Sequence, residues 1–330
     1  MDDLKISRRS LLASSGAVVF ASGFLGRAFA ASAKAPLTFG FDQATSWGTI
    51  GMIGKAEKTF EKAGANVRIH TFGSGTATRN AMVAGRIDIG VLGATPFIFG
   101  AAKSDLVAIA IAMYAGKTDA VVAGIKTGIK SVKDLKGRRV ASRVGSATNY
   151  VFLNKILPAY GLTQSDIHLV NTPFKDQVAA LAAGSVDAFA GVEPFPSIAE
   201  VDHLGIVLVD YSRFDMLPVV LAARRPVVER EPEAVVAFLR GWLAAVKLFN
   251  DDRAKAVRVV TRIFKGQGFK ISEKVIALML SKLDVNPRYV PGIERYFENQ
   301  SEIFIKEHKL AAMPQWNTLI NRALLQKAMS

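Results

Sequence analysis

The stretch AMVAGRID at residues 81–88 recurs 99 residues later as ALAAGSVD at residues 180–187. In each copy a helical pattern ends, the chain turns at a glycine, and an apolar strand follows with an aspartate at its start. Each copy then leads to a loop that contains a proline, Pro96 or Pro194. Because each copy lies inside its own series of strands and helices, the repeat predicts two similar α/β lobes.

Strand and helix patterns alternate on both sides of each copy. The first series predicts strands at 37–41, 66–72 and 86–92 and helices at 50–62 and 76–84. The second predicts strands at 139–143, 167–171 and 186–190 and helices at 147–160 and 176–183. Further strands are expected at 107–112, 120–125, 207–209 and 219–223, and helices at 233–250, 252–264, 272–283, 293–308 and 316–328. This order predicts mostly parallel sheets flanked by helices, in a chain that visits the second lobe and returns.

The first thirty residues have the pattern of an export signal. Arg8 and Arg9 precede an apolar run at 10–25, and AFA at 28–30 offers small residues to a signal peptidase. The adjacent arginines and the weak hydrophobicity favour the twin-arginine exporter. The run is too short to be a transmembrane anchor. We therefore expect residues 1–30 to be cleaved and the mature protein to reside in the periplasm.

Composition narrows the function classes. The 330-residue chain has no cysteine, which excludes disulfide scaffolds, thiol nucleophiles, Cys-ligated metals and a lipid anchor on cysteine. Its formal net charge is +14. The densest basic stretch, 130–139, has no interleaved aromatic residues, so we expect a solvated turn there and no nucleic-acid partner. Outside the cytoplasm, a cationic surface would instead attract small anions.

Two glycine-containing loops follow predicted strands, FGSGTAT at 72–78 and VGSATN at 144–149. In parallel α/β folds the carboxyl ends of the strands hold the ligands. Glycine lets the backbone approach a ligand closely, and the N–H groups at a helix start favour an anion. The same residue types are typical of ordinary helix capping, and both interpretations stay open for these loops.

Enzyme signatures are weak. The stretch 73–78 begins like a dinucleotide fingerprint but ends at Thr78, where glycine or alanine is required. The P-loop, G-x-S-x-G and H-E-x-x-H motifs are missing, and the four histidines are scattered. Asp88 and Asp187 are expected at the sheet edges opposite the two loops, so paired acid–base chemistry is not expected. We therefore expect no catalytic residue, no cofactor and no metal.

Two more side chains are expected at the edge that carries the loops. Glu193 follows the strand at 186–190 and precedes a proline-rich turn, so its carboxylate either points into a cleft or is solvated. Trp47 follows the first strand and either walls the cleft or covers the first lobe. The residues alone leave both questions open.

The order and spacing of these motifs resemble the solute-binding components of ABC importers. The resemblance is to the nitrate/sulfonate/taurine-type group, which is related to thiamine-pyrimidine-precursor binding proteins. Besides the arginine pair, it rests on GSG at 73–75, AGRID at 84–88, GATP at 93–96, DLKGRRV at 134–140, GS at 145–146, GSVDA at 184–188, VEP at 192–194 and VLAARR at 220–225, and it covers about residues 36–249.

The resemblance implies an α/β, two-lobed periplasmic-binding-protein fold of type II, with a two-stranded hinge. Residues 36–122 and 225–330 would form the first lobe and 123–224 the second. Val192 stands where members often carry a tryptophan, which removes an aromatic wall from the expected cleft. The ligand-binding residues that the resemblance implies are Gln43, Trp47, Ser74, Gly75, Thr76, Thr95, Ser146, Ala147, Thr148 and Glu193.

The function that the resemblance implies is capture of a small organic anion, sulfonate- or taurine-like, by hinge closure. A monomer would deliver it to a membrane permease and its ATPase. The alternatives are an aromatic carboxylate, nitrate or bicarbonate, or a pyrimidine in the same scaffold. From other classes come a pyrimidine-synthase-like enzyme, disfavoured by the missing cysteines and the export signal, and a periplasmic sensor module.

Overall fold

Two five-stranded sheets organise the part of the chain that our computed structural model describes, residues 35–104 and 106–330. The expected export signal lies outside the described residues. The first sheet has the strand order β2-β1-β3-β10-β4 and the second β7-β6-β8-β5-β9. The strands are β1 Leu37–Asp42, β2 Val67–Phe72, β3 Ile89–Gly93, β4 Leu106–Tyr114, β5 Asp119–Gly124, β6 Arg139–Ser142, β7 His168–Asn171, β8 Ala188–Val192, β9 Gly205–Asp210 and β10 Pro218–Arg224.

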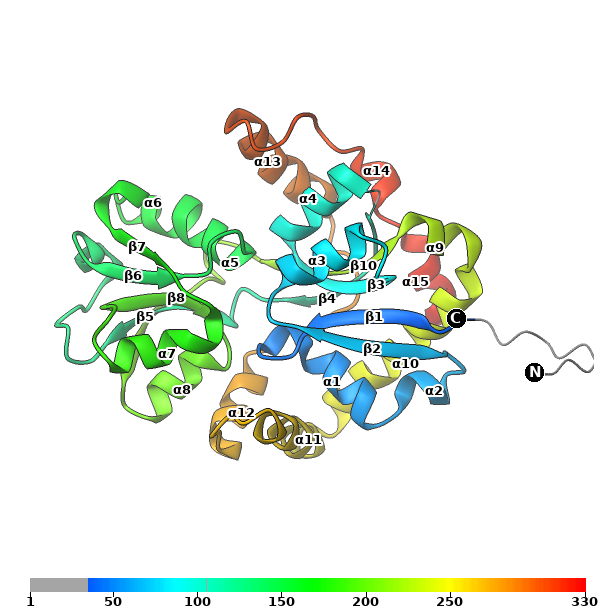
Figure 1. The fold of residues 1–330 in the computed structure, drawn as a ribbon, viewed down its shortest axis with the longest axis horizontal. Helices are drawn as coiled ribbons and strands as arrows, with labels where there is room; N and C mark the ends of the chain where they lie inside the picture. The colour runs from blue at the N-terminus through cyan, green and yellow to red at the C-terminus, as the bar shows by residue number, and fades with distance from the viewer. Residues whose placement is uncertain (1–34, 105) are drawn as a thin grey trace, which may run out of the picture. The chain divides into compact units, whose positions relative to one another are not determined.

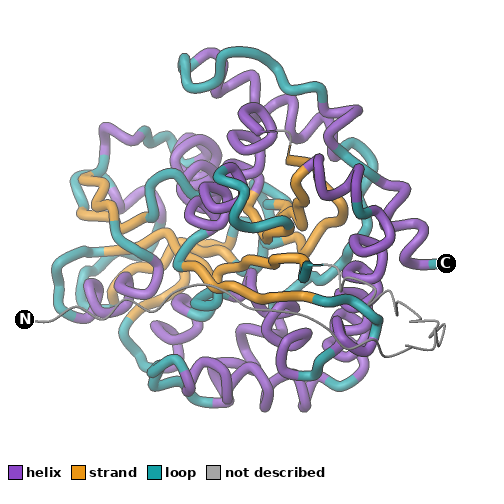
Figure 2. The backbone as a smooth tube through the Cα atoms, turned by 45° about the vertical axis from the view of Figure 1, so that its right-hand side comes forward, coloured by secondary structure: helices purple, strands orange, loops and turns teal. Residues whose placement is uncertain are grey.

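Helices flank both sheets. In Figure 1, α3 and α4 lie on one side of the first sheet and α1, α2 and α10 on the other. Figure 2 shows the strands inside and the helices outside. The helices are η1 Ser46–Gly48, α1 Thr49–Ala56, α2 Thr59–Lys62, α3 Gly75–Val83, α4 Ala94–Ser104, η2 Val132–Leu135, α5 Ala147–Val151, η3 Phe152–Ile156, α6 Leu157–Ala159, η4 Gln164–Asp166, α7 Phe174–Ala182, α8 Phe195–Val201, α9 Arg225–Arg230, α10 Pro232–Asp251, α11 Arg253–Gly266, α12 Glu273–Ser281, α13 Ile293–Lys306, α14 Trp316–Leu319 and α15 Arg322–Met329. Among the described residues, none of these helices is long and apolar enough to span a membrane.

The two sheets have equivalent topologies, which confirms the predicted α/β fold with two similar lobes. In each sheet one strand, β10 or β5, is antiparallel to both of its neighbours, and the other four run in one direction. These two strands are the ones that enter a sheet directly after the chain has crossed from the other sheet. The first lobe is defined below by the first sheet and the second lobe by the second sheet.

The two segments that cross between the sheets, residues 115–118 and 211–217, are joined to each other by backbone hydrogen bonds. Ala115 N donates to Leu217 O at 2.9 Å, and Tyr211 N donates to Gly116 O at 2.9 Å. The chain therefore passes between the lobes as two cross-linked segments, which is the two-stranded hinge that the resemblance implied.

Sheet pairing differs from the expected lobe boundaries at two strands. Strand β5 pairs with β8 and β9, so residues 119–122 belong to the second sheet and not to the first. Strand β10 pairs with β3 and β4, so residues 218–224 belong to the first sheet and not to the second. Apolar patterning predicts a strand but carries no information about which sheet receives it.

The sequence repeat has an equivalent role in each sheet. Asp88 N donates to Thr38 O, and the Asp88 carboxylate accepts from Thr38 N at 2.9 Å. In the second sheet Asp187 N donates to Arg139 O, and the Asp187 carboxylate accepts from Arg139 N at 2.8 Å. Gly85 and Gly184, with φ of 73° and 69°, make the preceding left-handed turns. Both aspartates thus join neighbouring strands, which confirms that they stand at strand starts.

Two predicted helices are interrupted. The helix expected at 50–62 breaks because Lys58 adopts a left-handed conformation with φ of 56°, which separates α1 from α2. The helix expected at 316–328 breaks at Ile320, which forms a bridge to Ala108 on β4. Asn321 N also donates to Ala108 O at 2.8 Å, so this C-terminal segment covers the outer edge of the first sheet.

Aromatic residues fill the core between the first sheet and α10. The Phe39 ring on β1 lies 5.0 Å from Phe238 and 6.0 Å from Trp242, measured between centroids. Phe60 on α2 stacks on Phe238 at 5.0 Å. Gly241 lets α10 approach this cluster closely, because a Cβ there would stand 2.7 Å from the Cα of Phe60.

We predict that Gly241→Ala lowers the free energy of unfolding by about 2 kcal/mol, because the added methyl group meets backbone atoms that cannot move aside. Gly266→Ala is the matched control, because Gly266 ends α11 and a Cβ there meets nothing within 4 Å. The control variant should be unchanged or up to about 1 kcal/mol more stable. Urea unfolding followed by circular dichroism measures both, and equal effects would contradict the packing argument.

Candidate functional site

The starts of two helices, one from each lobe, meet between the sheets. The Thr76 hydroxyl of α3 donates to the Gly145 carbonyl, which precedes α5, at 3.3 Å. Ser74 Oγ accepts from Ala77 N, and Ser146 Oγ accepts from Asn149 N, so both serines cap their helices. The capping interpretation is therefore confirmed, and the two loops also face each other.

Trp47 packs at the centre of this contact and is only 6% exposed. A Cβ placed on Gly93 of β3 would stand 2.8 Å from the Trp47 ring and 3.0 Å from the Cβ of Ala147. The indole of the first lobe, the glycine at the end of β3 and the first residue of α5 thus lie in one cluster. Trp47 therefore lies near the boundary between the lobes, without lining the groove between them.

Asp119, the first residue of β5, is fully buried beside this cluster. Its carboxylate accepts hydrogen bonds from the hydroxyl groups of Thr148 and Thr118. Burial raises the pKa of Asp119 well above its usual value, and the two hydroxyl groups oppose the rise only in part. A charged carboxylate is therefore more costly at this position than at the protein surface.

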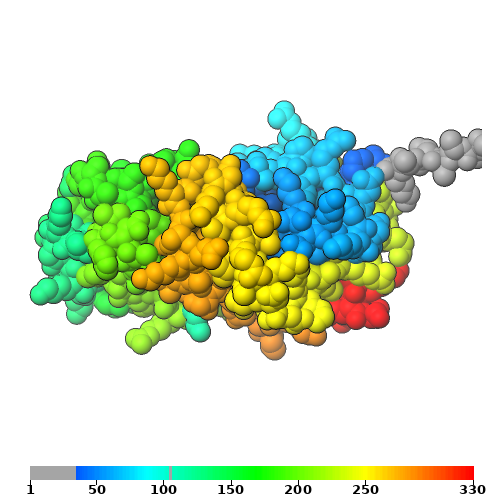
Figure 3. Space-filling model, turned by 90° about the horizontal axis from the view of Figure 1, so that it is seen from below, coloured from blue at the N-terminus to red at the C-terminus, as the bar shows by residue number. Residues whose placement is uncertain are grey.

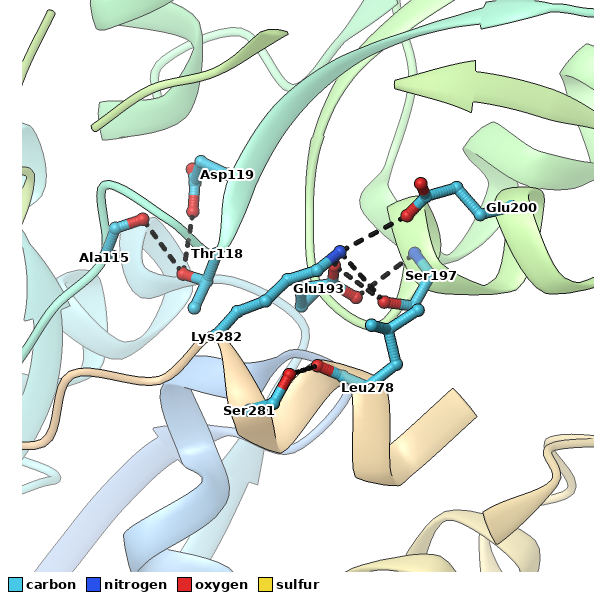
Figure 4. Close-up of polar contacts among 9 residues, drawn as sticks. All are labelled: Ala115, Thr118, Asp119, Glu193, Ser197, Glu200, Leu278, Ser281 and Lys282. Carbon is cyan, nitrogen blue, oxygen red and sulfur yellow. Dashed lines mark hydrogen bonds and ion pairs between the residues drawn. The ribbon is translucent and has the colours of Figure 1, made fainter. Parts of the chain in front are cut away.

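Glu193 lies between the lobes and is 1% exposed (Figure 4). Its backbone carbonyl accepts from Ser46 N in the first lobe at 2.8 Å, and its N–H donates to Thr118 O at 2.8 Å. Its carboxylate accepts from Ser197 Oγ at 2.8 Å and lies 2.6 Å from Lys282 Nζ. The buried carboxylate thus has a cationic partner of its own.

Lys282 comes from the C-terminal end of α12. Its ammonium also lies 3.3 Å from the carboxylate of Glu200 on α8. Burial lowers the pKa of Lys282, but the carboxylates of Glu193 and Glu200 reverse the effect and raise it overall. In Figure 3 the orange surface of α12 lies against the green surface of the second lobe. Lys282, at the end of α12, therefore forms ion pairs with two residues of the second lobe.

A second charged contact between the lobes lies at the return crossing. The buried Asp215 accepts from the Tyr296 hydroxyl of α13 at 2.8 Å and pairs with Lys155 of the π-helical η3. The Lys155 ammonium also lies 5.3 Å from the centroid of the Tyr296 ring. Two C-terminal helices, α12 and α13, thus contact the second lobe through buried charges.

A groove of about 580 Å³ opens between the lobes beside this contact. Thr95 from the first lobe and Ser146 from the second line it. Gln43 does not, because it lines a separate cavity of about 290 Å³ with Phe41 and Met52 in the first lobe. Of the expected ligand-binding residues, Thr95 and Ser146 therefore line this groove and Gln43 lies apart from it, whereas Thr76 and Glu193 contact the other lobe without lining the groove.

Several site residues had no signal in the sequence. Asp119 stands at the start of an apolar strand and looked like an ordinary strand boundary. Lys282 is 89 residues from Glu193 and belongs to a helix that matched the family only in character. Among the described residues, no group of three or more His, Asp or Glu side chains is placed to hold a metal ion.

Comparisons with known proteins identify the family and the relatives of this chain. A model of the NMT1-like family matches residues 30–264. A putative aliphatic sulfonates-binding protein of Bacillus subtilis (strain 168) is 31% identical over 222 residues, which are 67% of this chain and 66% of that protein. One from Escherichia coli (strain K12) is 29% identical over 219 residues, 65% of this chain and 68% of that protein.

A solved structure has the same fold. The alkanesulfonate-binding protein SsuA from Xanthomonas axonopodis pv. citri, bound to MOPS, superposes with a TM-score of 0.76 at 23% identity. The match covers 88% of this chain and 99% of that one. Together with the sheet topology, this match confirms the expected two-lobed fold.

We predict that Lys282→Met lowers the free energy of unfolding by about 3 kcal/mol, because it leaves the Glu193 carboxylate buried without a cation. The double variant Lys282→Met with Glu193→Gln should recover much of the loss. Lys247→Met is the control, because its ion pair with Asp251 is exposed and is worth about 1 kcal/mol or less. Urea unfolding of the four proteins checks this, and equal losses in the two lysine variants would refute it.

A second prediction concerns Asp42 at the end of β1, whose pKa burial raises to about 7. The folded protein keeps a proton on Asp42 that the unfolded chain releases. The protonated carboxyl group therefore contributes to the free energy of unfolding fully below pH 3.8, and this contribution is lost as the pH rises through about 7. Asp42→Asn should therefore flatten the decline in stability between about pH 5 and about pH 8. Denaturation at both pH values tests this, with the exposed Asp251→Asn as the control that should keep the decline.

Proposed function

The chain belongs to the NMT1-like family, and on this premise we propose that it is the extracytoplasmic solute-binding component of an ABC importer. Its solute would be a small organic anion, sulfonate- or taurine-like, and it would deliver the solute to a membrane permease. The names of its relatives, aliphatic sulfonates-binding proteins, support this substrate class. The observation that carries the proposal is the contact between Thr76 and Gly145, because it joins two helix starts from opposite lobes.

The proposed mechanism is capture by closure. The first N–H groups of a helix have no partner inside the helix, and the helix dipole favours an anion there. Helix α3 offers such groups from the first lobe. Helix α5, which continues without a break through η3 and α6, offers them from the second. An anion that touches both starts binds the closed arrangement more tightly than the open one, and it therefore shifts the population toward closure.

The buried carboxylates do not oppose an anion in this arrangement. The hydroxyl groups of Thr148 and Thr118 donate hydrogen bonds to the Asp119 carboxylate. Lys282 pairs with Glu193 at 2.6 Å. The Glu193 carboxylate is therefore not an unpaired negative charge at the boundary between the lobes, which supports the assignment of a negatively charged ligand.

The proposal is binding without chemistry. The chain has no cysteine, which argues against thiol catalysis. The buried carboxylates of Asp119 and Glu193 have partners within the protein, namely hydroxyl groups for both and the Lys282 ammonium for Glu193. Export through the twin-arginine pathway and action as a monomer complete the proposal.

Calorimetry on the protein without residues 1–30 tests the proposal with the anions ethanesulfonate, benzoate and nitrate, the zwitterion taurine, and an uncharged pyrimidine. We expect an organic anion to bind with a Kd near ~1 μM, which corresponds to about −8 kcal/mol. Binding of the uncharged pyrimidine alone would overturn the anion assignment. Steady turnover of any of these compounds would overturn binding without chemistry.

Ala147→Phe should abolish this binding, because the larger side chain would stand against Trp47 and Gly93 and keep the lobes apart. Ala183→Phe is the matched control on an exposed position at the end of α7, and it should bind as the natural protein does. Circular dichroism would verify that both variants are folded. Unchanged affinity in Ala147→Phe would show that binding does not need the lobes to meet here.

A further inference from the structure

The groove between the lobes is lined by three aromatic rings. Phe99 from α4 and Phe304 from α13 lie 4.8 Å apart between centroids, and Tyr150 from α5 lies 5.2 Å from Phe304. Phe304 and Tyr150 belong to opposite lobes, and α4, α5 and α13 converge in Figure 1. Leu153 adds an aliphatic side chain from the second lobe. These side chains form a wall suited to a flat apolar body.

Polar groups stand at defined places in the same groove. Thr95 Oγ1 accepts from Gln300 Nε2 at 2.7 Å, which leaves the Thr95 hydroxyl proton to donate to a ligand. Asn149 is 7% exposed, lines the groove, and its Oδ1 has no hydrogen-bond partner among the described residues. A buried acceptor without a donor is costly, so this oxygen points to a ligand with a donor group.

Charge in the lining is balanced at the rim. Lys309 Nζ pairs with the Glu307 carboxylate at 2.9 Å, and both residues line the groove. This ion pair therefore adds no net charge to the lining of the groove.

The size of the groove exceeds what the smallest sulfonates need. Its 580 Å³ lies within the range of about 300–1,000 Å³ that is typical of pockets for drug-sized ligands. Taurine or nitrate alone would leave part of this volume to water.

From these observations we propose that the groove takes an aromatic monoanion whose ring carries a hydroxyl or amino group. The charged group lies beside the start of α5, where Ser146 lines the groove, and accepts from the Thr95 hydroxyl. The ring packs against Phe99 and Phe304, and the ring substituent donates to Asn149 Oδ1. This inference rests on the proposed function for the single negative charge, and it adds the aromatic body and its donor group.

Calorimetry with ethanesulfonate, benzenesulfonate and 4-aminobenzenesulfonate tests the inference on the protein without residues 1–30. Benzenesulfonate should bind about tenfold more tightly than ethanesulfonate, and the amino compound more tightly still. Phe99→Ala should remove most of the advantage of the ring. Asn149→Ala should remove the advantage of the amino group and leave that of the ring.

Phe269→Ala is the matched control, because Phe269 is a partly buried phenylalanine with ring contacts of its own outside the groove. It should preserve the whole order of affinities. Melting without ligand, together with retained ethanesulfonate binding, would show that Phe99→Ala is folded.

The two proposals fail in different ways. If ethanesulfonate binds as tightly as both arenesulfonates, or if Phe99→Ala weakens all three ligands equally, the aromatic assignment is wrong and the importer function stands. If the amino group gives no advantage that Asn149→Ala removes, the donor assignment is wrong. If no anion of either panel binds, the proposed function itself is wrong.

Discussion

Each sheet depends on one strand that the chain adds directly after it has crossed from the other sheet. Strand β5 enters the second sheet directly after β4 completes its run in the first, and β10 enters the first sheet directly after β9. Because both delivered strands lie inside their sheets, between two partners, neither sheet is continuous without its crossing segment. The hydrogen bonds at Ala115 and Tyr211 then hold the two segments together. The boundary between the lobes follows from this constraint.

Buried charge gives that boundary its specificity. Glu193, Lys282 and Asp215 all lie where the lobes meet, and each has a partner on an element from the other lobe or from a crossing segment. Buried ion pairs contribute little net stability but are costly to mismatch. Pairs of this kind therefore select one relative position of the lobes over its neighbours, and they must be exchanged for water when the lobes separate.

Much of the fold was accessible from local pattern. The repeat around Gly85 and Gly184 predicted two similar lobes, and strands such as β1 and helices such as α10 lie within a residue or two of their expected bounds. The same patterns could not assign β5 and β10 to their sheets, because pairing is decided by partners far away in the sequence. Nor could they foresee the break at Lys58, where tertiary packing overrides helix propensity.

The candidate site was accessible only in part, for a related reason. Glycine and hydroxyl residues after strands are local signals, and they identified the two facing loops around Ser74 and Ser146. Asn149 and Phe304 line the same groove although they are 155 residues apart in the sequence, and no local sequence pattern predicts such a contact. The aromatic wall and the unpartnered amide therefore became visible only in three dimensions.

The strand arrangement also sets an order of assembly. All five strands of the second sheet come from one uninterrupted stretch, residues 119–210, whereas the first sheet needs residues 37–114 and then 218–224. During synthesis from the N-terminus, the later-emerging lobe can therefore complete its sheet first, while the earlier one waits with β3 and β4 unjoined. Until Arg224 has left the ribosome, two apolar strand edges lack their common neighbour, and this interval is when the nascent chain is most exposed to wrong pairing.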